Sequence, residues 1–70
     1  MNHVDNAYFQ QYTGRSRSFV DALDSLSIDS SYAYRKKIAA VNHIQCVVGS
    51  AKWNTTMLDL LKQGKLRKVA

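Results

Sequence analysis

The sequence predicts a small α+β domain that is mainly helical, with three helices packed around a short two-stranded sheet. The chain has 70 residues, which is enough for one domain. Three apolar segments have helical spacing, and each follows a serine that can cap a helix start. Two other segments are rich in aromatic or β-branched residues, and we expect both to be extended. A two-stranded ribbon is stable only when helices cover it.

The clearest helix signal follows Gly49, which permits a turn. Ser50 can then cap a helix that we expect to run from about residue 51 to residue 63, with Gly64 as its stop. The apolar residues of this helix are Trp53, Met57, Leu58, Leu60 and Leu61. This band is too wide for one buried stripe, so part of it is expected to meet something outside the core.

Two helices are predicted earlier in the chain. The first should span about residues 18–27, because Ser16 or Ser18 can cap it and apolar residues recur on one face from Phe19 to Leu26. The second should span residues 32–41 after a turn at residues 28–31, with Asn42 as a left-handed stop.

The predicted sheet joins residues 7–13 to residues 44–48. Placing residues 12–26 over residues 47–61 aligns Gly14 with Gly49 and Leu23 with Leu58, so both halves show an extended segment, a glycine and a capped helix. We therefore expect the two extended segments to pair. Residues 1–6 are polar and without periodicity, which indicates a linker remnant before a domain at residues 7–70.

The formal net charge of +5 comes from ten Lys or Arg and five acidic residues, all of them Asp. This charge favours an anionic partner such as nucleic acid, an anionic membrane surface or an acidic wall polymer. The sequence shows neither a membrane-spanning apolar run nor a signal-peptide pattern. We expect a protein that is made in the cytoplasm without its own signal peptide and does not act in a membrane.

Residues for catalysis or for binding a metal are sparse. Glycan hydrolases use paired carboxylates, and the only close pair is Asp21 and Asp24 at a helix start, where they interact with the helix dipole. His43 and Cys46 have a ligand-like spacing, but structural zinc needs four ligands. The sequence therefore predicts a binding module that is not an enzyme and has no metal or cofactor.

Aromatic side chains on a small basic domain suit sugars, because a ring packs on the C–H face of a pyranose while polar neighbours hold hydroxyl and carboxylate groups. The candidate ligand-binding residues are Tyr8, Tyr12, Arg15, Arg17, Tyr32, Trp53 and Asn54. A fold of this size also needs an additional source of stability, and oligomerisation is the source that the sequence leaves open. The candidate interface residues are Trp53, Met57 and Leu60. For Trp53, a ligand contact, a subunit contact and the edge of the core all stay open.

Two rival functions have some support. Arg35, Lys36 and Lys37 on the second helix suggest a small basic helical domain that binds nucleic acid. The basic residues are otherwise spread along the chain, and the helices lack a tight helix-turn-helix join. The other rival is an oligomerisation domain without a ligand.

Several separate phrases of the sequence resemble one family. YTGRSRSFVDALDSLSIDSSYAYRKKIAAVNHI and VGSAKWNTTMLDLLKQGKL resemble the C-terminal cell-wall-binding domains of bacteriophage endolysins, especially those of enterococcal phages. The resemblance extends from Tyr12 to Lys68. It implies a non-catalytic module that binds peptidoglycan or a wall glycan, targets an endolysin to the Gram-positive host wall, and multimerises for avidity. The implied partners are the wall polymer, further copies of the chain in a tetramer, and the full-length endolysin with its catalytic domain.

The sequence departs from the family pattern at three places. Val47, Val48 and Gly49 stand where relatives tend to have a Tyr-Thr-Gly turn. Trp53 replaces a usual Gln, and His43 stands where Gly is common. The change at position 53 implies either an altered ligand contact or a larger apolar interface.

Overall fold

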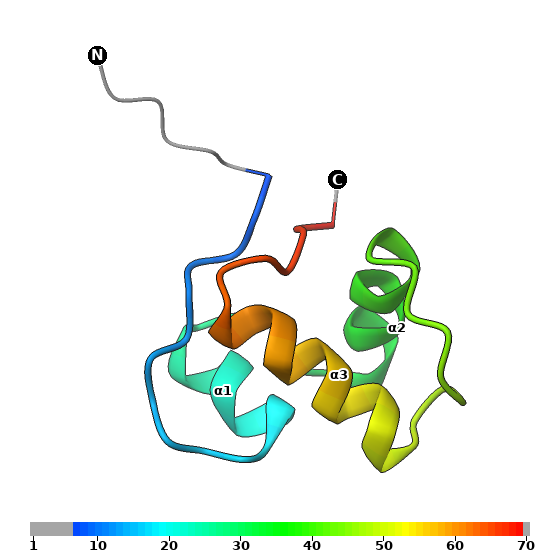
Figure 1. Ribbon diagram of the computed structural model, residues 1–70, viewed down its shortest axis with the longest axis horizontal. Helices are drawn as coiled ribbons and strands as arrows, with labels where there is room; N and C mark the ends of the chain where they lie inside the picture. Colours follow the sequence, from blue (N-terminus) through cyan, green and yellow to red (C-terminus); the bar gives the residue numbers. More distant parts are fainter. Residues whose placement is uncertain (1–6, 70) are drawn as a thin grey trace.

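The structure is a computed structural model that describes residues 7–69, and within these residues it contains three helices (Figure 1). Helix α1 is Phe19–Ser25, α2 is Tyr32–Val41 and α3 is Ala51–Lys62. The three predicted helices are confirmed, and their ends differ from the expected ones by at most two residues. The predicted linker at residues 1–6 lies outside the described residues.

Each of the three helices begins at a serine cap. The hydroxyl of Ser18 accepts a hydrogen bond from the Asp21 N–H at 3.2 Å, and Ser31 accepts one from the Tyr34 N–H at 3.2 Å. Ser50 accepts the equivalent bond from Trp53 at 3.1 Å. These bonds satisfy N–H groups that have no partner within the helix, which is why the starts were predictable from local sequence.

Each helix also ends in the same way, with a residue of positive φ just after the cap. These residues are Ser27 at φ 59°, His43 at 55° and Gly64 at 71°. After α2, the N–H of His43 bonds to the Ala40 carbonyl and that of Ile44 to the Ala39 carbonyl, which is the Schellman arrangement. The prediction that Asn42 is left-handed is wrong, because its φ is −95° and His43 makes the turn.

The predicted two-stranded sheet is wrong, and the described residues form an all-helical domain. Residues 44–48 form a loop whose Val47 is 79% exposed, and they do not pair with residues 7–13. The partner of the N-terminal segment is instead the C-terminal tail. Phe9 donates a hydrogen bond to the Leu66 carbonyl at 2.8 Å, Lys68 donates one to the Ala7 carbonyl at 2.8 Å, and Tyr8 forms a single antiparallel bridge with Arg67.

The core lies around α3, which packs against α1 and runs between α1 and α2 in the view of Figure 1. Its largest fully buried side chains are Trp53, Leu23, Ile38, Met57, Leu61 and Leu66. The wide apolar band of α3 is thus covered within one chain, because the N-terminal segment and the tail pack on the face that the first two helices leave open. Within residues 7–69, no helix is long and apolar enough to cross a membrane.

Candidate functional site

The structure separates the seven predicted ligand residues. Tyr12 and Trp53 are buried in the core, where neither ring can stack on a ligand. Arg15 and Arg17 are exposed on the loop before α1. The remaining three residues are exposed or half-buried and lie in two places. Tyr8 is on the N-terminal segment, whereas Tyr32 is at the start of α2 and Asn54 is in the first turn of α3.

The predicted subunit interface changes in the same way. Trp53 and Met57 have no exposed surface, so neither can contact another subunit in this conformation. The interface prediction assumed that a second face of α3 had no partner within the chain, whereas these two side chains pack inside it. Leu60 is half-buried and is the one predicted interface residue that reaches the surface.

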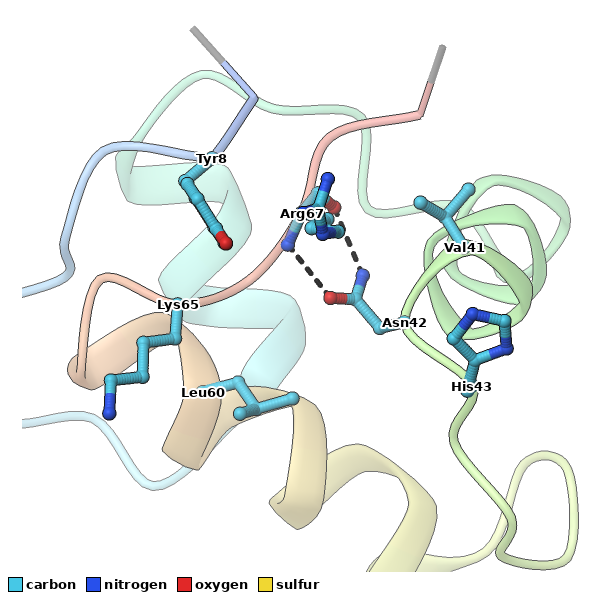
Figure 2. A pocket seen from close by; sticks show the side chains of 7 residues that line it. All are labelled: Tyr8, Val41, Asn42, His43, Leu60, Lys65 and Arg67. Atoms are coloured by element: carbon cyan, nitrogen blue, oxygen red, sulfur yellow. Dashed lines mark hydrogen bonds between the residues drawn. The ribbon is translucent and has the colours of Figure 1, made fainter. Parts of the chain in front are cut away.

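A groove of about 360 Å³ lies between the ends of α2 and α3 and the two terminal segments. Figure 2 shows Tyr8 and Lys65 on one side of it and Val41 and His43 on the other, with Asn42 and Arg67 between them. Leu60 of α3 also lines it. The seven lining residues combine one aromatic ring, two aliphatic side chains, an amide, an imidazole and two cations, with no acidic residue among them.

Asn42 fixes one wall of this groove. Its Nδ2 donates to the Arg67 carbonyl at 3.0 Å, and its Oδ1 accepts from the Arg67 N–H at 2.8 Å (Figure 2). The same Nδ2 also donates to the Ile38 carbonyl within α2 at 2.8 Å. The side chain therefore joins the end of α2 to the C-terminal tail and sets the position of Arg67.

The ring of Tyr8 and the guanidinium of Arg67 lie against each other. The Cζ of Arg67 is 5.2 Å from the ring centroid, which is within the range of a cation–π contact. The backbone bridge between the two residues brings them opposite each other. Lys65 is two residues earlier on the tail, and it lines the groove with Arg67 while the intervening Leu66 is buried.

The sequence indicated only Tyr8 as a ligand residue of this groove. The local sequence gives Asn42 the role of a helix stop and gives Lys65 and Arg67 no ligand role. The signal that could have indicated both cations is their alternation with the apolar Leu66, because in an extended segment this pattern puts Lys65 and Arg67 on the same side. Nothing in the local sequence indicates that Asn42 reaches a segment 25 positions away.

A second cluster lies where α2 begins. The rings of Tyr32 and Trp53 have centroids 6.1 Å apart, and the Cζ of Arg35 lies 5.9 Å from the first ring and 5.8 Å from the second. The Nζ of Lys36 is 5.3 Å from the Tyr32 ring centroid. Arg35 also donates to Asn54 Oδ1 at 2.7 Å. Arg35 therefore joins three of the predicted ligand residues, although it was itself named only for the nucleic-acid alternative. These three residues are Tyr32, Trp53 and Asn54.

Next to this cluster, Asp29 has a lowered pKa because its carboxylate accepts hydrogen bonds from the backbone N–H and the side chain of Ser31. Desolvation opposes this lowering of the pKa, and the charge of Lys37 adds a smaller lowering effect. Among residues 7–69, no three His, Cys, Asp or Glu residues form a group that could hold a metal ion.

The sequence is similar to the L-alanyl-D-glutamate peptidase of Listeria phage A118, with 44% identity over 50 residues. These residues are 71% of this chain but 18% of the relative, so the chain spans less than a fifth of that protein's length. No family model matches the sequence. No solved structure matches it either.

This similarity relates the chain to a bacteriophage endolysin, as the phrase pattern suggested. The expectation that the protein is not an enzyme is contradicted by this comparison, because the relative is named as a peptidase. Wall binding and the enterococcal type stay predictions.

Proposed function

We propose that this chain binds a polymer of the bacterial cell wall and so holds a bacteriophage peptidase at its substrate. The observation that carries the proposal is the groove that Lys65 and Arg67 line together with Tyr8, whose ring lies beside the Arg67 guanidinium. The similarity to a phage L-alanyl-D-glutamate peptidase supports the lytic context. The net charge of +5 supports an acidic ligand.

The groove offers the groups that an acidic glycan or peptide needs. An aromatic ring provides a surface for the C–H face of a sugar, and an amide and an imidazole provide hydrogen bonds. Arg67 and Lys65 provide charge-assisted bonds to carboxylate or phosphate groups. Both cations line a groove without acidic residues, so their charge is free for a ligand rather than spent on a lining carboxylate.

The groove is also held in place before any ligand arrives. Two hydrogen bonds from Asn42 fix the Arg67 backbone, and the bonds between Phe9 and Leu66 and between Lys68 and Ala7 fix the two terminal segments against each other. A preformed site loses less conformational entropy on binding than a mobile one. Several copies bound to one wall would add avidity, so the homo-oligomer is retained as part of the proposal.

The test measures retention of the purified chain on Gram-positive wall sacculi. The variant Lys65→Gln/Arg67→Gln should lose about tenfold or more in affinity, because it removes both cations of the groove. The matched control, Lys37→Gln/Lys52→Gln, removes two exposed charges outside the groove and should stay within about twofold of the parent protein.

Salt separates this proposal from nucleic-acid binding. Duplex DNA should compete only at low salt, with an affinity that falls log-linearly as salt rises, whereas contacts of sugars with the Tyr8 ring should persist at high salt. Equal losses in both double variants would show that net charge, not the groove, holds the chain on the wall. Failure of the parent protein to bind sacculi, together with DNA binding, would overturn the proposed function.

A further inference from the structure

The cluster at the start of α2 has an open aromatic face. Tyr32 is 50% exposed, and the loop before α3 lies beside its ring, since a Cβ placed on Gly49 would be 3.5 Å from the Tyr32 Cε1. Behind it, the fully buried Trp53 holds the ring at a tilt of 53°. The Tyr32 ring is therefore packed against the core on one side and half exposed, with Arg35 and Lys36 over it.

The hydrogen bonds that Arg35 makes in this cluster go to neutral acceptors. Arg35 donates through Nε to the Ser30 carbonyl at 3.0 Å and through Nη1 to the Asn54 side chain at 2.7 Å, and both acceptors are neutral. Only two of the five N–H groups of its guanidinium are used in these bonds. Nearby, the Asp29 carboxylate is hydrogen-bonded to Ser31 and interacts with Lys37.

These contacts hold Arg35 in a fixed position. Its guanidinium lies within 6 Å of the centres of two aromatic rings and is hydrogen-bonded to both the turn before α2 and the first turn of α3. A guanidinium held in this way loses little rotamer entropy when it binds an anion. Lys36, in contrast, is exposed and can move aside to admit a ligand to the Tyr32 ring.

We propose that Tyr32, Arg35 and Lys36 form a second binding site, which takes a sugar unit that carries an acidic group. The ring of the sugar would pack on Tyr32, and its carboxylate or phosphate would bind the free N–H groups of Arg35 and the ammonium of Lys36. This inference rests on the proposed function, because it assigns the site to the same wall polymer.

The two sites lie at opposite ends of α2, since Tyr32 is its first residue and Asn42 follows its last. A ten-residue helix is about 15 Å long, so one polymer chain that reaches both sites would be held at two points. The second contact then forms at a high effective concentration, which slows release from the wall.

The test follows the backbone amide signals of the chain by NMR during titration with three oligosaccharides. One carries carboxylates, one carries phosphates and one is neutral. We expect the signals of Tyr32 and Arg35 to shift with an acidic oligosaccharide and not with the neutral one. The comparison of the two acidic probes shows which anion the site takes.

The matched variants are Lys36→Gln and Lys37→Gln, which remove one exposed charge each from neighbouring positions of the same helix. The first should weaken binding at Tyr32 by about fivefold, and the second should change it by less than twofold, because Lys36 lies over the ring. Tyr32→Ala should abolish these shifts, and if this variant does not fold, the lysine pair still decides the question.

The outcomes for the two sites are distinguishable. Shifts at Arg67 without shifts at Tyr32 would overturn the second site and support the groove. Shifts at Tyr32 without shifts at Arg67 would support the second site and place the wall contact outside the groove. Equal effects of the two lysine variants would overturn the second site, because they would show that net charge alone governs the binding.

Discussion

The side-chain amide of Asn42 pairs with the backbone of Arg67 as one strand pairs with another, donating to its carbonyl at 3.0 Å and accepting from its N–H at 2.8 Å. Asn42, the C-cap of α2, thereby makes the two hydrogen bonds that a neighbouring strand would make to this edge of the tail. On its other side the tail pairs with the N-terminal segment, where Tyr8 and Arg67 form a bridge.

Asn42→Ala should release the tail and open the groove. The loss of these bonds, and of the bond to Ile38, should lower the free energy of unfolding by about 1–3 kcal/mol, a large share for a domain of this size. Amide exchange at Arg67 should become faster. Gln45→Ala, at an exposed loop position, is the control and should leave both quantities unchanged. Normal protection of Arg67 in Asn42→Ala would contradict the role of this side chain.

His43→Gly should stabilise the fold. His43 has a φ of 55°, which costs an L-residue about 1–2 kcal/mol, while the greater backbone entropy of an unfolded glycine offsets about half of this gain. We expect thermal unfolding to show a net gain of about 0.5 kcal/mol. Ala40→Gly, in the exposed last turn of α2, should instead lose about 1 kcal/mol. A loss in both variants would mean that His43 contributes more through its side chain than its backbone costs.

Trp53→Ala should unfold the domain or come close to doing so. The side chain is fully buried, and truncation of a buried Trp costs about 3–5 kcal/mol, which is comparable to the whole stability of a 70-residue domain. Trp53→Phe should cost clearly less, because the indole Nε1 has no hydrogen-bond partner within the described residues. Circular dichroism with urea titration gives both values. A folded and stable Trp53→Ala protein would show that the side chain is not central to the core.

Gly14→Ala should destabilise the loop before α1. A Cβ at this position would lie only 2.7 Å from the Tyr12 Cε1, and the ring cannot move freely because its hydroxyl accepts a hydrogen bond from the Ser16 N–H at 3.0 Å. We expect a loss of about 1–3 kcal/mol in chemical denaturation, as for an overpacked core. Thr13→Ala, at the exposed neighbour, should stay within about 0.5 kcal/mol of the parent.

The pKa of Asp29 should lie below 3.8 in the folded protein and return to that value on unfolding. A lowered pKa stabilises the folded state above the unfolded pKa, and this contribution is lost as the pH falls through the folded pKa. An NMR titration of the Asp29 carboxyl group checks the direction. Lys37→Gln should raise this pKa toward 3.8, whereas Lys36→Gln should leave it unchanged. Asp29→Asn should remove this part of the acid dependence of stability.

The sequence alone predicted much of the secondary structure. The three serine caps and the stop at Gly64 bond to groups only three to five residues away, so their effect is determined by local sequence. His43 shows the limit of such reasoning. Its neighbour Asn42 has the stronger intrinsic preference for a left-handed conformation, but its side chain is bound to the distant Arg67.

The tertiary structure decided which segments meet and which side chains are buried. Residues 7–13 have extended character, but the sequence could not show whether their partner was the loop after α2 or the tail after α3, because backbone hydrogen bonds do not depend on side-chain identity. That choice also placed Trp53 and Met57 in the core and left Tyr32 at the surface. The helices follow from local bonds, whereas the groove and the Tyr32 cluster depend on how four distant segments share one small core.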